Sequence, residues 1–329
     1  MAVPIWQDYI VDLGAPASAG AGVPFYIYCV PQSAIIYQGL AYPKPGESTA
    51  KVRINDICAD YIRNYFLEQP DPSLPAVATF TVYATTTGQA VQKGSAEFYN
   101  NWSYDPDYIT LMGMNFPVVQ TFGAKQFLLL NLMSGLPSNA TITMDSGRTV
   151  TYTPTKSRTI EVGHSSVTQY FGDSYVVPMD EFPGAVRVVM GGKTYVASKR
   201  CPRYALYYLN AYGGWDGLPV EGRTVRSDAV THNTSEQVYD NNNPTARGKV
   251  NFLNELKPTF SFRTGWLTDA QSARMHHLLN SPRVFMHDME SDVVRAIVLT
   301  GNTTEYKQYP GLLHSYTIEA ELAQDRIRR

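Results

Sequence analysis

Hydrophobic and polar residues alternate in short runs along most of the chain, and Pro, Gly and Ser separate the runs. PFYIYCV, AIIYQGLAY and AKVRIN are the first examples, and similar runs rich in aromatic and β-branched residues follow up to residue 198. Two turns are explicit, one at residues 145–147 (DSG) and one at Gly191–Gly192, where a Gly-Gly pair can supply the positive φ angles of a hairpin. The pattern predicts two tandem β-sandwiches, over residues 1–110 and 111–198.

One stretch of the first predicted sandwich has helical rather than strand periodicity. In NDICADYIRNYFLEQP, which starts at Asn55, apolar residues recur along one helical face. We expect Asn55 or Asp56 to cap this helix, Pro70 to end it, and the helix to cover about residues 55–68. Its apolar face would close the open end of the first core. The residues of this face are Ile57, Cys58, Tyr61, Ile62, Tyr65 and Phe66.

The C-terminal part of the chain, residues 199–329, has a different arrangement of apolar and polar segments. The basic, proline-bearing segment SKRCPR marks the predicted boundary before it. Its first strand, YALYYLNAY, is followed by GGWDG and then by a polar stretch at about 226–247. We interpret this stretch as a hairpin or a long exposed arm that becomes ordered against a partner subunit.

A second helix is predicted within this C-terminal part, at about residues 268–280. Thr268 and Gln271 fit a capping box, and Met275, Leu278 and Leu279 face inward. Strands precede and follow this helix. The fold predicted for the whole chain is therefore mainly β: tandem β-sandwich domains, then a C-terminal β-rich domain that carries one α-helix.

The segment YALYYLNAYGGWDGLPVEGR, which starts at Tyr204, places many aromatic rings beside glycines. Bulky residues on both faces of an alternating strand indicate burial on both faces, by a central position or by another subunit. The alternative is a sugar platform, with Asn210 and Asp216 as hydrogen-bonding neighbours of the rings. The candidate interface or ligand-platform residues are Tyr204, Tyr207, Tyr208, Tyr212, Trp215 and Trp266.

Composition narrows the classes of partner. Charged residues make up only 17% of the 329 residues, and the net charge is −2. A neutral surface suits contact with protein or sugar better than contact with phosphate, so we expect no nucleic-acid partner. The N-terminus, MAVPIWQDYIVDLG, does not have the pattern of a signal peptide, and FLLLNLM is far too short to span a bilayer, so no membrane insertion is expected. Cys29, Cys58 and Cys201 are predicted to be buried apolar filler.

Several segments match the beginning or a part of a known catalytic or ligand-binding motif, but none matches a whole motif. MGGKT lacks the first glycine of a phosphate loop, and GDS at 172–174 does not continue into the complete G-x-S-x-G pattern of a hydrolase nucleophile turn. The pairs His276–His277 and His287–Asp288 lack metal-ligand spacing. YDNNNP lacks the glycine and glutamate of a calcium loop. We expect no catalytic, cofactor-binding or metal site, and an enzyme such as a glycan hydrolase ranks last.

Several segments resemble a group of uncharacterised structural proteins of tailed phages and prophages of gut Bacteroidetes. They are YYLNAYGGWDGLPVEG, GWLTDAQSARMHHLLNSPRVFMHD and YTIEAELAQDRIRR, and IWQDYIVDLG and VRINDICADYI fit the N-terminal part of the same group. The helix-then-strand ending is also similar to distal-tail and tail-completion proteins.

This resemblance implies a non-enzymatic bacteriophage virion structural protein, a tail, connector or baseplate component made in the host cytoplasm. Assembly into a ring or other symmetric oligomer would use copies of the chain and other virion proteins. The alternative is a carbohydrate- or receptor-binding module on the particle, with a host surface glycan as its partner.

Overall fold

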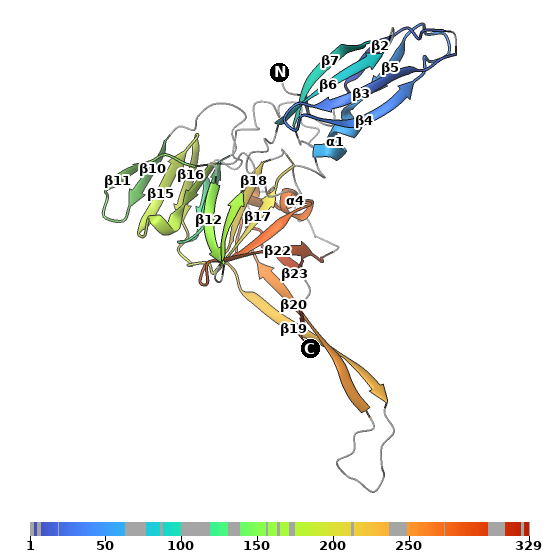
Figure 1. Ribbon diagram of the computed structural model, residues 1–329. Coiled ribbons are helices and arrows are strands. Elements are labelled where there is room, and N and C mark those ends of the chain that lie inside the picture. The colour runs from blue at the N-terminus through green and yellow to red at the C-terminus, as the bar shows by residue number, and fades with distance from the viewer. Residues whose placement is uncertain are drawn as a thin grey trace.

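The computed structural model is mainly β, which confirms the predicted fold class (Figure 1). Its helices are short, and its strands form several sheets. The structure describes residues 3–4, 8–18, 20–62, 77–85, 88–99, 119–130, 139–155, 157–162, 165–170, 175–211, 214–236, 249–272, 274–301, 313–323 and 326–328.

The first part of the chain forms a β-sandwich, here called the N-terminal sandwich. A five-stranded sheet in the order β1-β7-β6-β3-β4 faces the two-stranded sheet β2-β5. Phe25, Phe80 and Leu13, which come from both sheets, meet in one buried core. The strands are β1 (Val3–Pro4), β2 (Ile10–Gly14), β3 (Val23–Cys29), β4 (Ala34–Ala41), β5 (Ala50–Arg53), β6 (Val77–Thr85) and β7 (Ala90–Tyr99).

Helix α1 (Asn55–Tyr61) packs on the core of this sandwich through its buried Cys58. The prediction that Asn55 or Asp56 caps it is wrong, because Ile54 occupies the N-cap position and makes no side-chain cap bond. Asp56 lies in the first turn, and its carboxylate accepts a hydrogen bond from Arg53 at 2.6 Å. The rest of the predicted apolar face after Ile62, namely Tyr65 and Phe66, and the expected end at Pro70 lie outside the described residues.

The second part of the chain forms the middle domain. The small sheet β14-β9 packs on the five-stranded sheet β11-β10-β15-β16-β8, and their facing apolar side chains form a second core. Both predicted turns are confirmed, since Gly147 has a φ of 79° and Gly191 and Gly192 have φ angles of 55° and 77°. The strands are β8 (Val119–Phe122), β9 (Phe127–Leu130), β10 (Ala140–Met144), β11 (Thr149–Tyr152), β12 (Ser157–Val162), β13 (Ser165–Tyr170), β14 (Tyr175–Pro178), β15 (Ala185–Met190) and β16 (Lys193–Ala197).

The last part forms the C-terminal domain, built on an eight-stranded sheet. The main order is β18-β17-β21-β22-β23-β20-β19, and β24 pairs with β20. The strands are β17 (Tyr204–Leu209), β18 (Trp215–Val220), β19 (Thr224–Glu236), β20 (Lys249–Arg263), β21 (Val284–Asp288), β22 (Val293–Leu299), β23 (Thr317–Leu322) and β24 (Arg326–Arg328).

Helices α3 (Asp269–Ser272) and α4 (Arg274–Leu279) form the helical segment of the C-terminal domain. The predicted capping box is confirmed: the Thr268 N–H donates to Gln271 Oε1 at 3.0 Å, and the Gln271 N–H donates to Thr268 Oγ1 at 3.3 Å. Met275 and Leu278 point into the core, as predicted, and the Leu279 side chain is half-buried.

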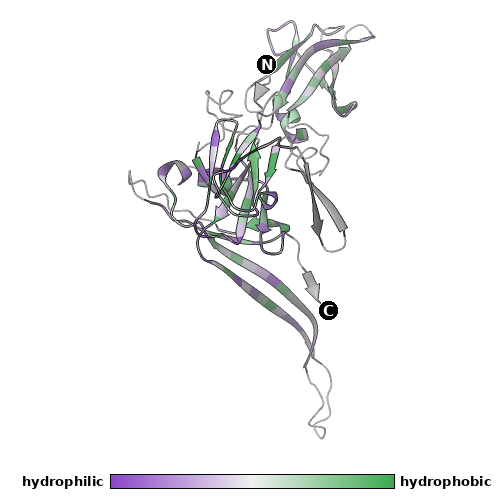
Figure 2. Cartoon of the chain, turned by 90° about the vertical axis from the view of Figure 1, so that its left-hand side faces the viewer, coloured by the Kyte–Doolittle hydropathy of each residue, from purple (hydrophilic) through white to green (hydrophobic). Residues whose placement is uncertain are grey.

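Strands β19 and β20 continue beyond the sheet as a long antiparallel hairpin, which extends away from the body of the molecule (Figure 1). We call this hairpin the arm. Hydrophobic residues concentrate in the strands of the body, whereas hydropathy is mixed along the arm (Figure 2). The polar stretch expected at 226–247 begins within β19, which pairs with β20 over a longer range; residues 237–248 lie outside the described residues.

The middle and C-terminal domains are packed against each other. Residues 198–203, the SKRCPR segment, connect β16 to β17, but a buried cluster joins the two domains beyond this connection. We call the packed region the joint. Its apolar members are Phe127, Leu129 and Val176 of the middle domain and Ala205, Tyr207, Leu209, Trp215, Met289 and Val294 of the C-terminal domain.

Candidate functional site

The aromatic strand β17 lies inside the C-terminal sheet, between β18 and β21. Strand alternation sends Leu206 and Tyr208 to the core beneath α4, and Tyr207 to the joint with β9. Tyr207 and Tyr208 are both fully buried. The strand is buried on both faces, as its bulk on both faces indicates.

Of the two kinds of cover expected for this strand, a central position and another subunit, the structure shows the first. Strand β9 of the same chain covers the Tyr207 face, so no neighbouring subunit is needed there. Trp215 is also buried in the joint, with its ring centroid 5.4 Å from that of Phe285. Tyr207, Tyr208 and Trp215 are therefore core residues of the joint and of the C-terminal domain, and neither an interface with another subunit nor a sugar platform.

Tyr207 is held by hydrogen bonds as well as by packing. Its hydroxyl accepts a hydrogen bond from the Phe127 N–H at 2.8 Å, and the two rings stack at 5.6 Å. The same hydroxyl lies 3.4 Å from Nδ1 of His287, whose Nε2 lies 2.9 Å from Oδ1 of Asp292. An imidazole protonated at Nε2 satisfies this chain of contacts. The chain links β9 to β21, and so fixes the middle domain on the C-terminal domain.

The other predicted residues do not lie beside Tyr207, Tyr208 and Trp215. Tyr204 is half-buried, with its ring 5.2 Å from the Arg203 guanidinium and 5.8 Å from the Phe262 ring. Trp266 is 56% exposed and follows the end of β20. Tyr212 lies outside the described residues. The six candidates therefore do not form one site.

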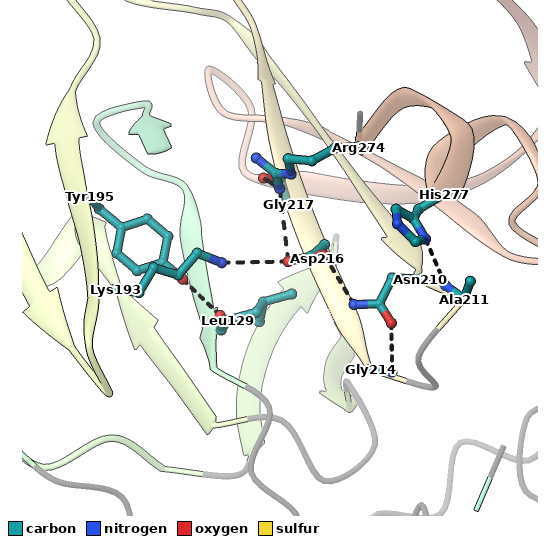
Figure 3. A network of polar contacts seen from close by, with 10 residues as sticks. All are labelled: Leu129, Lys193, Tyr195, Asn210, Ala211, Gly214, Asp216, Gly217, Arg274 and His277. Atoms are coloured by element: carbon teal, nitrogen blue, oxygen red, sulfur yellow. Dashed lines mark hydrogen bonds and ion pairs between the residues drawn. The ribbon is translucent and has the colours of Figure 1, made fainter. Parts of the chain in front are cut away.

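A group that the sequence analysis missed lies at the joint: three charged side chains from three elements meet in the interior (Figure 3). Lys193 begins β16, Asp216 lies on the edge strand β18, and Arg274 begins α4. Asp216 Oδ1 lies 3.6 Å from Lys193 Nζ and 3.8 Å from Arg274 Nη2. Lys193 is only 1% exposed and Arg274 only 3%, so all three charges lie within the protein. We call this group the charged cluster.

Neighbouring groups position the members of the cluster. Asn210 donates to Asp216 Oδ2 at 3.0 Å, and Arg274 donates to the Gly217 carbonyl at 3.0 Å. The Lys193 ammonium lies 5.0 Å from the ring centroid of Tyr195, within cation–π range. The Tyr195 hydroxyl in turn donates to the carbonyl of Leu129 in β9 at 2.8 Å. The cluster is thus tied to β9, β16, β18 and α4.

Burial and charge act against each other in the cluster. Burial lowers the pKa of Lys193 to about 7, with the attraction of Asp216 opposing this shift and Arg274 adding to it. Burial raises the pKa of Asp216, but the charges of Lys193 and Arg274 outweigh burial and hold that pKa below its ordinary value. Asp216 is therefore a carboxylate near neutral pH, while Lys193 changes its charge there.

The chemistry open to this cluster is structural. Its charged atoms are buried, so a substrate would have to open the joint to reach them. A buried ion pair contributes little net stability relative to apolar packing, but it destabilises any arrangement that leaves one charge unpaired. The cluster therefore specifies how β16 of the middle domain is placed against β18 and α4.

The exposed surface of the arm is the second feature of functional interest. Every residue of β19 from Val225 to His232 is exposed, so this stretch has no cover on either face. Arg226 and Asp228 pair with each other along the strand at 2.9 Å, and Val225 and Val230 stand open to solvent. This surface offers a free strand edge, β-branched side chains and little net charge.

The cysteines divide into two kinds. Cys29 and Cys58 are buried in the N-terminal sandwich, as predicted, whereas Cys201 is exposed in the segment between β16 and β17. The prediction of burial is wrong for Cys201, because that segment runs over the surface.

Comparison of the chain with protein-family models, with curated proteins and with solved structures finds no match. Among the described side chains, no three of His, Cys, Asp or Glu come together in a group that could hold a metal ion. None of the helices in the described ranges has the length and apolar character needed to cross a bilayer.

Proposed function

We propose that this chain is a non-enzymatic structural protein of a bacteriophage virion, a tail, connector or baseplate component that assembles into a symmetric oligomer. The observation that carries this proposal is the arm. The partner on the arm is a second copy of the chain, in the virion made within the bacterial host.

The arm supports the proposal because its outer half lacks the packing that a hairpin needs. Within the described residues, β23 pairs with β20 only at Thr259–Arg263, and β24 only at Asn254–Leu256. Beyond these, Asn233–Glu236 and Lys249–Leu253 form a ribbon of two strands. An isolated two-stranded hairpin is at best marginally stable in water, so contact with a partner would stabilise it.

The arm extends away from the body, so it can reach a second copy of the chain (Figure 1). Two arms that pair with each other would make an isologous contact and a dimer, whereas an arm that binds another surface of the second copy would make a heterologous contact. Heterologous contacts generate rings when the rotation between copies closes and open filaments when it does not, so a ring requires that closure. The exposed edge of β19 can also extend a sheet of the neighbour by backbone hydrogen bonding.

A shortened arm tests the proposal. Asn-Gly replaces residues 233–253 and joins His232 to Asn254, which face each other in the ladder, so that the pairing of β24 is preserved. Light scattering after size-exclusion chromatography should show an oligomer for the parent chain and a folded monomer for the variant. A parent chain that stays monomeric at all concentrations, or a variant that assembles like the parent, contradicts the proposal.

A point substitution gives the matched control. Val230 on the arm and Val298 on β22 are both 49% exposed. Val230→Asp places a charge on the proposed contact and should weaken assembly, whereas Val298→Asp should leave the oligomer unchanged. Equal behaviour of the two variants would show that the arm is not the contact.

Carbohydrate binding is the second candidate, and one observation favours it. Tyr26 and Tyr28 alternate with core residues of β3 and so stand on the outward face of the N-terminal sandwich, where Tyr26 stacks on Tyr83 at 5.0 Å. Half-buried tyrosines on an outward sheet face are suited to stacking on sugar rings. Glycan-array binding that is lost in Tyr26→Ala with an unchanged melting temperature would support this function, and absence of binding in the parent would exclude these glycans.

A further inference from the structure

The charged cluster contains an odd number of charges. With all three side chains ionised, Lys193 and Arg274 oppose the single carboxylate of Asp216, and the cluster has a net charge of +1 inside the protein. With Lys193 neutral, the remaining Asp216–Arg274 pair balances. The two charge states differ by one proton at a place where the middle domain meets the C-terminal domain.

The other titratable groups that face the cluster keep their charge between pH 7 and pH 9. Burial raises the pKa values of Tyr195 and Tyr208 far above their ordinary range, so both rings stay neutral. Burial lowers the pKa of His277, whose Nδ1 accepts a hydrogen bond from the Ala211 N–H at 3.2 Å, and this ring is neutral as well. Burial lowers the pKa of Arg274, but Tyr208 and Asp216 outweigh burial and keep it above its ordinary value, so it remains a cation.

We propose that proton uptake by Lys193 loosens the packing of the middle domain on the C-terminal domain, so that the joint opens more readily at pH 7 than at pH 9. The proposal rests on the geometry of the cluster: an ammonium closed off from water, one shared carboxylate, and a guanidinium competing for the same oxygen Oδ1. Opening the joint returns Lys193 to water, where the charge is solvated.

The connection between the two domains permits such an opening. At one end of the segment the Ser198 N–H donates to the Phe122 carbonyl at 2.8 Å, and at the other end Arg203 pairs with Asp288 at 3.0 Å. Between these anchors Lys199 and Arg200 are exposed. In the proposed opening the domains part at the cluster and expose apolar side chains of the joint, while the separate core of each domain stays intact and residues 198–203 hold the two domains together.

The sign and the size of the effect follow from linkage. The ordinary pKa of a lysine, 10.5, applies to the open joint, and the pKa falls to about 7 in the closed joint. The open form therefore binds more protons between these values, and closure is favoured as the pH rises. One proton with these two pKa values lowers the ratio of open to closed joints roughly 50-fold from pH 7 to pH 9.

Hydrogen exchange measured by mass spectrometry tests the proposal. Protection of the amides of β9 and β18 in the joint, corrected for the intrinsic rates, should rise at least tenfold from pH 7 to pH 9. The amides of β3 and β6 serve as an internal reference, because they lie in a separate core. Protection at the joint that changes no more than at the reference overturns the proposal.

Two variants assign the effect to one side chain. Lys193→Met replaces the aliphatic part of the side chain with one of similar length and removes the charged ammonium, and should abolish the pH dependence at the joint. Lys125→Met, an exposed position in the turn between β8 and β9, should behave like the parent. A parent-like pH dependence in Lys193→Met contradicts the proposal.

If Lys193→Met does not fold, a titration of the lysine side chains in the parent chain still tests the proposal. NMR of protein labelled at the lysine side chains should show one lysine that titrates between pH 6 and pH 8. Titration of every lysine near its ordinary value of 10.5 would overturn the proposal.

Discussion

Replacing Asp216 with Asn is the sharpest test of how the joint is held together. The change keeps the shape of the side chain and removes the one carboxylate that lies near both Lys193 and Arg274. Breaking a buried ion pair by removing one partner costs about 3–5 kcal/mol, because the other charge is left uncompensated. Lys193 can lose its proton in response, but Arg274 cannot, so we expect a loss of about 3–4 kcal/mol at pH 7.

The loss of stability in Asp216→Asn should also depend on pH, because the substitution changes the pKa of Lys193. Without Asp216, the pKa of Lys193 falls below about 7, so the native variant binds fewer protons than the native parent as the pH drops toward 6. The stability of the variant relative to the parent therefore decreases from pH 9 to pH 6. Measured values should show a larger loss at pH 6 than at pH 9.

Urea unfolding followed by tryptophan fluorescence measures the effect. Asp228→Asn is the control, because Asp228 pairs with Arg226 on the exposed arm, where an ion pair contributes about 1 kcal/mol or less. If Asp216→Asn destabilised the protein no more than Asp228→Asn does, the charged cluster would have no structural role and the reasoning would be refuted.

Three further substitutions test the packing of the joint and of its neighbours. Trp215→Ala should cost about 3–5 kcal/mol because it empties a buried site, whereas Trp266→Ala should be nearly neutral; equal melting temperatures of the two would contradict the burial of Trp215. Tyr207→Phe should cost about 1–3 kcal/mol in urea unfolding, since the buried Phe127 N–H loses its acceptor, and an unchanged unfolding midpoint would argue against this bond. Gly191→Ala should destabilise the protein by more than Gly192→Ala. Both glycines have positive φ, but only at Gly191 would the added Cβ meet another side chain, at 2.9 Å from Leu130. Calorimetry that finds Gly192→Ala to be the more destabilising change would contradict the turn geometry.

Local features of the fold could be predicted from the sequence because their causes are local. The turn at Gly191–Gly192 needs only two residues that accept positive φ, and the capping box needs only Thr268 and Gln271 at the right spacing. The cap of α1 could not be predicted in this way. Asn55 and Asp56 are residue types that favour the N-cap position, but the N-cap is Ile54, which is buried and lies one position before Asn55 and two before Asp56, and Asp56 pairs with Arg53 instead.

The joint could be predicted only in part. Bulk on both faces of β17 indicates burial on both faces, but alternation along one strand says nothing about which segment provides the cover. The charged cluster gives no local signal, because Lys193, Asp216 and Arg274 come from separate elements and each looks like an ordinary surface residue in its own sequence context. Lys193 follows Gly191–Gly192 and reads as a turn lysine, although it is one of the most buried residues of the chain.

For the arm, the sequence pattern predicts the exposure that the structure shows, but neither identifies the partner. Polar and β-branched residues predict an exposed strand, and β19 is exposed from Val225 to His232. In the proposed assembly, the surface of a second copy that would meet the arm depends on how the copies are arranged, which the sequence pattern of one chain does not specify.

Native mass spectrometry of the purified parent chain measures self-assembly itself. We expect one discrete oligomer of defined stoichiometry, which gives way to monomer when residues 233–253 are replaced by Asn-Gly. A parent chain that remains monomeric at every concentration measured would contradict this expectation.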